Sequence, residues 1–128
     1  MNLEKVVFAF FILLAATLNF GFVYGDPTST DQHNAWELFA TIVVNLIATV
    51  LKFGDRTHIG AVHLASSLVA LLQLAAAALV WFFATRRTGT DLLTASAMAS
   101  IVSLAAGALL ANVTSVVIMI VETTLQRR

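Results

Sequence analysis

Four long apolar segments, separated by short polar ones, make up most of the chain. They cover about residues 6–24, 35–53, 59–84 and 92–121. Because a helix rises about 1.5 Å per residue, each segment could cross the roughly 30 Å hydrocarbon core of a bilayer. The short connections favour antiparallel neighbours. The pattern therefore predicts an all-α bundle of four transmembrane helices, with residues 1–128 forming one domain.

Polar residues at the segment boundaries indicate where the helices begin. Asn34 precedes the second segment and Glu37 follows three residues later, which is the spacing of a capping box. Asp91 is placed to cap the fourth segment. A signal peptide is the rival interpretation of the first segment. Its apolar run of about 19 residues is long for a signal peptide and favours a retained helix.

Composition agrees with a membrane protein and excludes several other classes. Hydrophobic residues make up 59% of the chain and charged residues only 11%, against about 25% charged residues in a soluble domain. The net charge is zero, so nucleic acid is not an expected partner. There is no cysteine, no metal-binding spacing among the histidines and no nucleophile–base set. We therefore expect no enzyme activity, no cofactor and no bound metal.

The Lys and Arg residues near the segment ends predict the orientation in the membrane. With both termini in the cytoplasm, the outer side carries only Arg86 and Arg87, and the inner side carries Lys5, Lys52, Arg56, Arg127 and Arg128. The positive-inside rule favours this arrangement. Tyr24, Trp36 and Trp81 would then form an aromatic belt at the outer interface, beside the acidic residues Asp26 and Asp31.

The second segment carries the clearest candidate site. Its polar residues are spaced by four and so form one slanted stripe on a helix: Glu37, Thr41, Asn45 and Thr49. Polar side chains within a membrane rarely face lipid, because an unpaired polar group is costly there. The stripe could therefore make hydrogen bonds between helices, or it could line a pore with Glu37, Asp26 and Asp31 at a negative outer mouth. Lys52, at the inner end of the segment, could reach the interface or pair with Glu122.

Small residues recur every four positions along the fourth segment, at Ala95, Ala99, Ser103, Gly107, Ala111 and Ser115. Such a stripe lets two helix backbones approach closely. We expect Ala99, Ser103, Gly107 and Ala111 to pack against another helix, either of the same chain or of a second subunit. Gln73 in the third segment is expected to bond to a neighbouring helix.

Parts of the chain resemble known families. Leu3–Phe8, Asn45–Thr57 and Gly107–Asn112 are similar to a family of small bacterial membrane proteins of unassigned function, which implies a bacterial inner membrane. Thr49–Asp55 is similar to the Thr-Val-Gly-Tyr/Phe-Gly-Asp filter of potassium channels, with Leu-Lys in place of the first Gly. That second resemblance implies that residues 35–55 re-enter the membrane instead of spanning it.

Taken together, these features predict a small homo-oligomeric channel for an inorganic ion, with cations favoured. One copy has few polar groups, whereas several copies of the second helix could enclose a water path. The alternatives are an accessory subunit that packs in the bilayer against a larger channel or transporter, and a small transporter.

Overall fold

The computed structural model describes residues 3–29, 33–54, 57–88 and 93–126, and it is all-α within those ranges. Its helices are α1 (Leu3–Val23), α2 (Ala35–Lys52), α3 (His58–Thr88) and α4 (Ala95–Gln126). All four are long and apolar enough to cross a membrane. The prediction of four such helices is confirmed, and the chain has the build of a multi-pass membrane protein.

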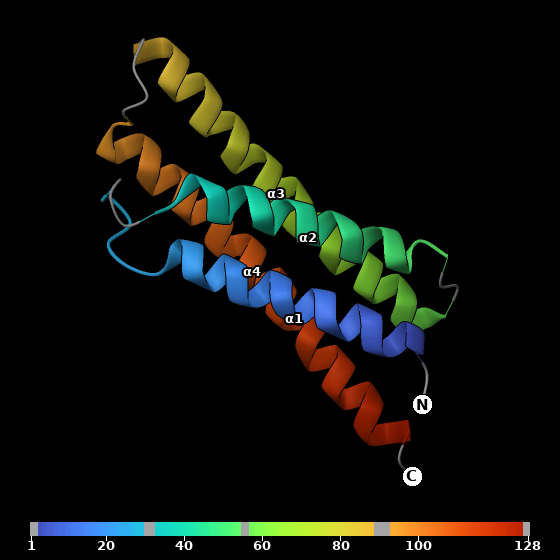
Figure 1. Ribbon diagram of the computed structural model, residues 1–128. Coiled ribbons are helices and arrows are strands. Elements are labelled where there is room, and N and C mark those ends of the chain that lie inside the picture. Colours follow the sequence, from blue (N-terminus) through green and yellow to red (C-terminus); the bar gives the residue numbers. More distant parts are fainter. Residues whose placement is uncertain (1–2, 30–32, 55–56, 89–92, 127–128) are drawn as a thin grey trace.

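The helices form a four-helix bundle in which each helix packs against two others. α1 packs against α2 and α4, and α3 packs against the same two helices. Successive helices run antiparallel, so both chain ends lie at the same end of the bundle (Figure 1). We call this end, marked by Leu3, Lys52, His58 and Gln126, the termini end. The other is the opposite end.

Short polar side chains cap the N-termini of α2 and α4. The Asn34 side chain accepts a hydrogen bond from the backbone N–H of Trp36 at 2.8 Å, which confirms the predicted cap of α2. At the start of α4, the Thr94 hydroxyl accepts from the N–H of Ala97 at 3.1 Å. α4 therefore begins later than the sequence analysis predicted. Asp91, the predicted cap, lies outside the described residues.

Two of the helices are longer than a bilayer core requires. α3 has 31 residues and α4 has 32, so they extend over about 46 and 48 Å. Both run past α1 and α2 at the opposite end, and α4 also projects at the termini end (Figure 1). α4 continues beyond the predicted boundary at residue 121 because Glu122–Gln126 contain no helix breaker.

The interior of the bundle is only partly apolar. A large cluster of buried apolar side chains includes Phe22, Leu38, Leu74, Met98 and Ile101. A smaller cluster, at the termini end, is made by Phe8, Ile12 and Ala48. The outer surface is apolar as well, with large side chains such as Phe10, Leu72 and Leu110 mostly exposed, as expected for a surface in contact with lipid. Most of the remaining buried residues among those described are polar.

Candidate functional site

The polar stripe of α2 points into the bundle of a single copy. Thr41, Asn45 and Thr49 are 0%, 0% and 2% exposed. Thr41 donates its hydroxyl hydrogen to the carbonyl of Glu37 at 2.6 Å, and Thr49 donates to the carbonyl of Asn45 at 2.8 Å. The Asn45 amide donates to the carbonyl of Thr41 at 2.9 Å. Its Oδ1 atom is buried and has no hydrogen-bond partner among the described residues.

Glu37 lies where the stripe reaches the opposite end. Its side chain is half-buried and crosses to α1, where its carboxylate lies against Gly21. A Cβ atom at Gly21 would come within 2.6 Å of the Glu37 Oε2 atom. The missing side chain at Gly21 therefore makes room for the carboxylate.

The other three helices contribute buried polar side chains that complete the site. Asn19 of α1, Ser67 of α3, and Asn112 and Ser115 of α4 are at most 1% exposed. Their side-chain polar atoms have no hydrogen-bond partner within the described part of the chain. Sequence reasoning missed Asn19 and Ser67. The signal was present at Asn19, which interrupts an apolar segment as Asn45 does.

Gln73 of α3 faces α4 at the middle of the bundle. Its amide lies against Gly107, where an added Cβ would be 2.7 Å from Oε1 and 2.9 Å from Nε2. The buried Oε1 atom has no hydrogen-bond partner among the residues described. Gly107 thus packs against another helix of its own chain, through a polar side chain.

These polar residues are distributed along most of the bundle axis. Asn45 lies about 12 Å along α2 from Glu37, and His63 lies about 15 Å along α3 from Gln73, at 1.5 Å per residue. His63 is 1% exposed and makes an edge contact with the Phe8 ring at the termini end. We call the set the polar core: Asn19, Thr41, Asn45, Thr49, His63, Ser67, Gln73, Asn112 and Ser115.

A cavity of about 520 Å³ lies where the polar core reaches the termini end, and we call it the termini-end cavity. Lys5, Lys52, His63 and Glu122 line it. The Lys5 ammonium forms an ion pair with Glu122 at 3.2 Å, and the Lys52 ammonium lies 4.2 Å from the centre of the Phe8 ring. Glu122 is therefore paired with Lys5, whereas the sequence pattern also allows Lys52 as its partner.

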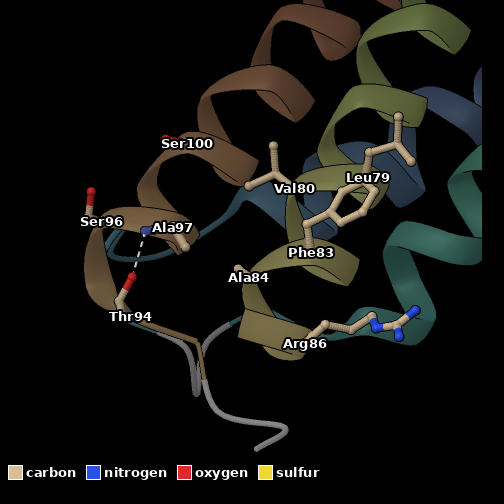
Figure 2. A pocket seen from close by; sticks show the side chains of 9 residues that line it. All are labelled: Leu79, Val80, Phe83, Ala84, Arg86, Thr94, Ser96, Ala97 and Ser100. Carbon is tan, nitrogen blue, oxygen red and sulfur yellow. Dashed lines mark hydrogen bonds between the residues drawn. The ribbon is translucent and has the colours of Figure 1, made fainter. Parts of the chain in front are cut away.

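A second cavity, of about 910 Å³, lies at the opposite end between the last turns of α3 and the first turns of α4. Figure 2 shows its side chains, with Val80 and Phe83 on one wall and Ala97 on the other. Arg86 marks its rim and points away from the α4 wall (Figure 2). Most of the lining is apolar.

The small residues of α4 do not form one buried face. Ala99, Gly107 and Ala111 are half-buried and Ser103 is exposed. Ser115 is the one residue of that pattern in the buried face of the described helix, which is otherwise made by Met98, Ile101, Val102, Ala105, Ala108 and Asn112. A packing role for Ser103 would therefore require a contact outside the single bundle.

The connection between α1 and α2 is held by its own polar residues. The Asp26 carboxylate accepts hydrogen bonds from the backbone N–H of Thr28 at 2.9 Å and from its hydroxyl at 2.8 Å. These bonds lower the pKa of Asp26 below its usual value. The buried His33 ring contacts the backbone carbonyls of Phe22 and Asp26. Asp31, the other acidic residue predicted at the mouth, lies outside the described residues.

Helix α2 includes the first four residues, 49–52, of the segment that resembles a potassium-channel filter. Thr49 and Lys52 are both helical, and the backbone N–H of Phe53 bonds to the carbonyl of Val50. A filter loop would instead point its carbonyl oxygens at the ion. The re-entrant alternative for residues 35–55 concerns their placement in the bilayer, and it stays a prediction.

Comparison with known proteins places the chain in a family without assigning it an activity. No curated protein and no solved structure matches it. One family model matches residues 32–123, which hold α2, α3 and most of α4. The matched part contains every residue of the polar core except Asn19. The chain belongs to DUF6394, a family of unknown function.

Proposed function

We propose that the protein is a small cation channel of a bacterial inner membrane, with both termini in the cytoplasm, and that cations cross through the polar core of each bundle. One observation carries the proposal. All four helices bury amide or hydroxyl atoms that have no hydrogen-bond partner among the described residues, such as those of Asn19, Asn45, Ser67 and Asn112.

The energetic cost of these groups supports a path for water and ions. A polar group without a partner in an apolar medium costs several kcal/mol, roughly 2–7 depending on the reference state. Membrane proteins keep such groups mainly where they pair with one another or line a hydrated pathway. Amide and hydroxyl oxygens can also replace part of the water shell of an ion. The polar core has the chemistry for a narrow chain of water molecules.

The path differs from the one that the sequence analysis predicted. The polar stripe in the sequence predicts a pore on an axis between copies of α2. Thr41, Asn45 and Thr49 are buried inside one bundle, so a central axis between copies would not meet them. Conduction would not require the expected homo-oligomer, since each bundle would contain its own path.

The packing of the polar core favours the proton among cations. Thr41 and Asn45 have no exposed surface, and a hydrated metal ion would need the helices to separate. Protons can instead move along a chain of water molecules and side chains, as in other membrane proteins with polar interiors. Glu37 would concentrate cations at the mouth of the path, at the opposite end of the bundle.

A flux assay tests this proposal. Purified protein in liposomes should carry protons down an imposed potential, measured with an internal pH-sensitive dye. Asn45→Leu, which makes the middle of the proposed path apolar, should reduce the proton flux about tenfold or more. The matched control is Val43→Leu, on the outer side of the same helix, where the residue is 40% exposed. It should leave the flux unchanged.

Folded protein that gives no flux above empty liposomes, for protons or for K⁺, across pH and membrane voltage, would overturn the proposal. So would equal losses in Asn45→Leu and Val43→Leu. Glu37→Gln tests the mouth separately, because it removes one negative charge and should lower the preference for cations over anions.

An accessory subunit remains the second candidate, and the cavity of Figure 2 favours it. The splayed ends of α3 and α4 present apolar side chains there, including Leu79 and Phe83, which are 56% and 62% exposed. A helix of a larger membrane protein could cover this surface. An accessory subunit would give no flux alone, and Leu79→Ser would weaken its association with that partner without affecting the fold.

A further inference from the structure

The termini-end cavity combines an apolar wall with a positively charged rim. Val6, Ala9 and Met119 supply apolar lining. The charged lining consists of two lysines and one glutamate, which gives a formal charge of +1 before any protonation of His63. The cavity therefore suits an anion, with or without an attached apolar chain.

The charged side chains are positioned by contacts in the structure. Glu122 is only 19% exposed at its side chain and holds the Lys5 ammonium at the rim. The Lys52 ammonium lies over the face of the Phe8 ring. The Phe8 and His63 rings make a T-shaped contact, with their centroids 5.0 Å apart. His63 is nearly fully buried yet lines the cavity. Two cations and a histidine thus converge on one space, which is a donor set typical of phosphate sites.

We propose that the termini-end cavity binds a phosphate-bearing anion, held by Lys5, Lys52 and His63. Basic pockets between transmembrane helices at the cytoplasmic face bind anionic lipid headgroups, and free phosphate offers the same oxygen acceptors. The apolar residues Val6 and Met119 leave room for an acyl chain beside the phosphate. This inference does not depend on conduction, so a failure of either proposal leaves the other standing.

Thermal unfolding of the full-length protein in detergent tests the site. The protein is titrated separately with phosphatidylglycerol, with phosphatidylcholine and with sodium phosphate, at constant ionic strength. Phosphatidylglycerol or phosphate should raise the unfolding midpoint in a saturable way. Lys52→Gln should weaken the apparent affinity about tenfold, since it removes a charge-assisted hydrogen bond, and Lys52→Arg should retain it. Arg86→Gln, which removes a positive charge at the opposite end, is the matched control and should bind as the wild type does.

The titrations also distinguish the two sources of phosphate. Saturation by phosphatidylglycerol alone identifies a lipid site, and saturation by sodium phosphate identifies a site for a free anion. The proposal is overturned if neither compound saturates, if phosphatidylcholine is equally effective, or if Lys52→Gln and Arg86→Gln lose the same affinity. Lys5→Gln, at a half-exposed position, gives the same test if Lys52→Gln does not fold.

Discussion

The contact between Gly107 and Gln73 yields the sharpest quantitative prediction about the packing of this bundle. A Cβ atom added at Gly107 would lie 2.7, 2.9 and 3.0 Å from three atoms of the Gln73 amide. Ordinary contacts begin at 3.4 Å. The amide would therefore have to move by 0.7 Å to restore an ordinary contact, which is the difference between 3.4 and 2.7 Å.

Two opposing effects set the size of the change in Gly107→Ala. Overpacking a closely packed interior typically costs about 1–3 kcal/mol, and the low end applies here because the Gln73 amide is the far end of a flexible side chain. Replacing glycine by alanine within a helix recovers up to about 1 kcal/mol. We expect a net destabilisation of about 0–1 kcal/mol. In a Gln73→Ala background the obstacle is gone, so the same substitution should become neutral or stabilising.

The assay is a double-mutant cycle, measured by unfolding the four proteins in mixed detergent micelles. We expect a coupling free energy of about 1 kcal/mol between the two sites. Gly54→Ala is the control, since a Cβ atom there would have nothing within 4 Å, and it should change the free energy of unfolding by less than about 0.5 kcal/mol. Additive effects of Gly107→Ala and Gln73→Ala would refute the contact.

Two further predictions concern the ends of the bundle. The hydrogen bonds from Thr28 lower the pKa of Asp26 below its ordinary value of 3.8, so the stability that they provide is complete above that pH and is lost as the pH falls through the lower, folded-state pKa. Acid unfolding should therefore show a step below about pH 4 in the wild type that Asp26→Asn lacks, and identical acid curves would contradict it. Single cysteines at Ser29 and Thr57, which lie at opposite ends of the bundle, should react with an impermeant thiol reagent from opposite sides, Ser29 from outside the cell. Labelling of both from one side would exclude the topology.

The four helices were predictable because the bilayer imposes a strong constraint. A segment long enough to cross the core must be apolar and must satisfy its backbone internally, so hydropathy and length alone identify it. The Asn34 cap was predictable for a similarly local reason, since its bond spans two residues. The start of α4 was not, because Thr94 and Asp91 are both suitable caps and tertiary packing selects between such candidates.

The direction in which the α2 stripe points could not be predicted from the sequence. Burial is required of Thr41, Asn45 and Thr49 in any arrangement that avoids lipid, and an interior within one bundle satisfies this as well as an axis between subunits. Only the positions of the other helices decide between the two. The pairing of Glu122 with Lys5 likewise depends on the register of α4 against α1, which leaves no local trace in the sequence.

The composition of the interior argues that the polar core has a role beyond folding. The same bundle fills neighbouring interior positions with large apolar side chains, such as Ile12, Leu74 and Ile101, which have no exposed surface. Leucine at Asn19 or Asn112 would occupy a similar volume and would leave no amide without a partner.

Interhelical hydrogen bonds in membranes average only about 0.6 kcal/mol, with about 1.7 kcal/mol as the largest in one series. Even fully paired amides would therefore stabilise the bundle modestly, and amides whose atoms have no partner in the described chain stabilise it less still. Stability alone thus gives no reason for several such groups on four helices, whereas a hydrated path through the bundle requires polar groups at successive depths.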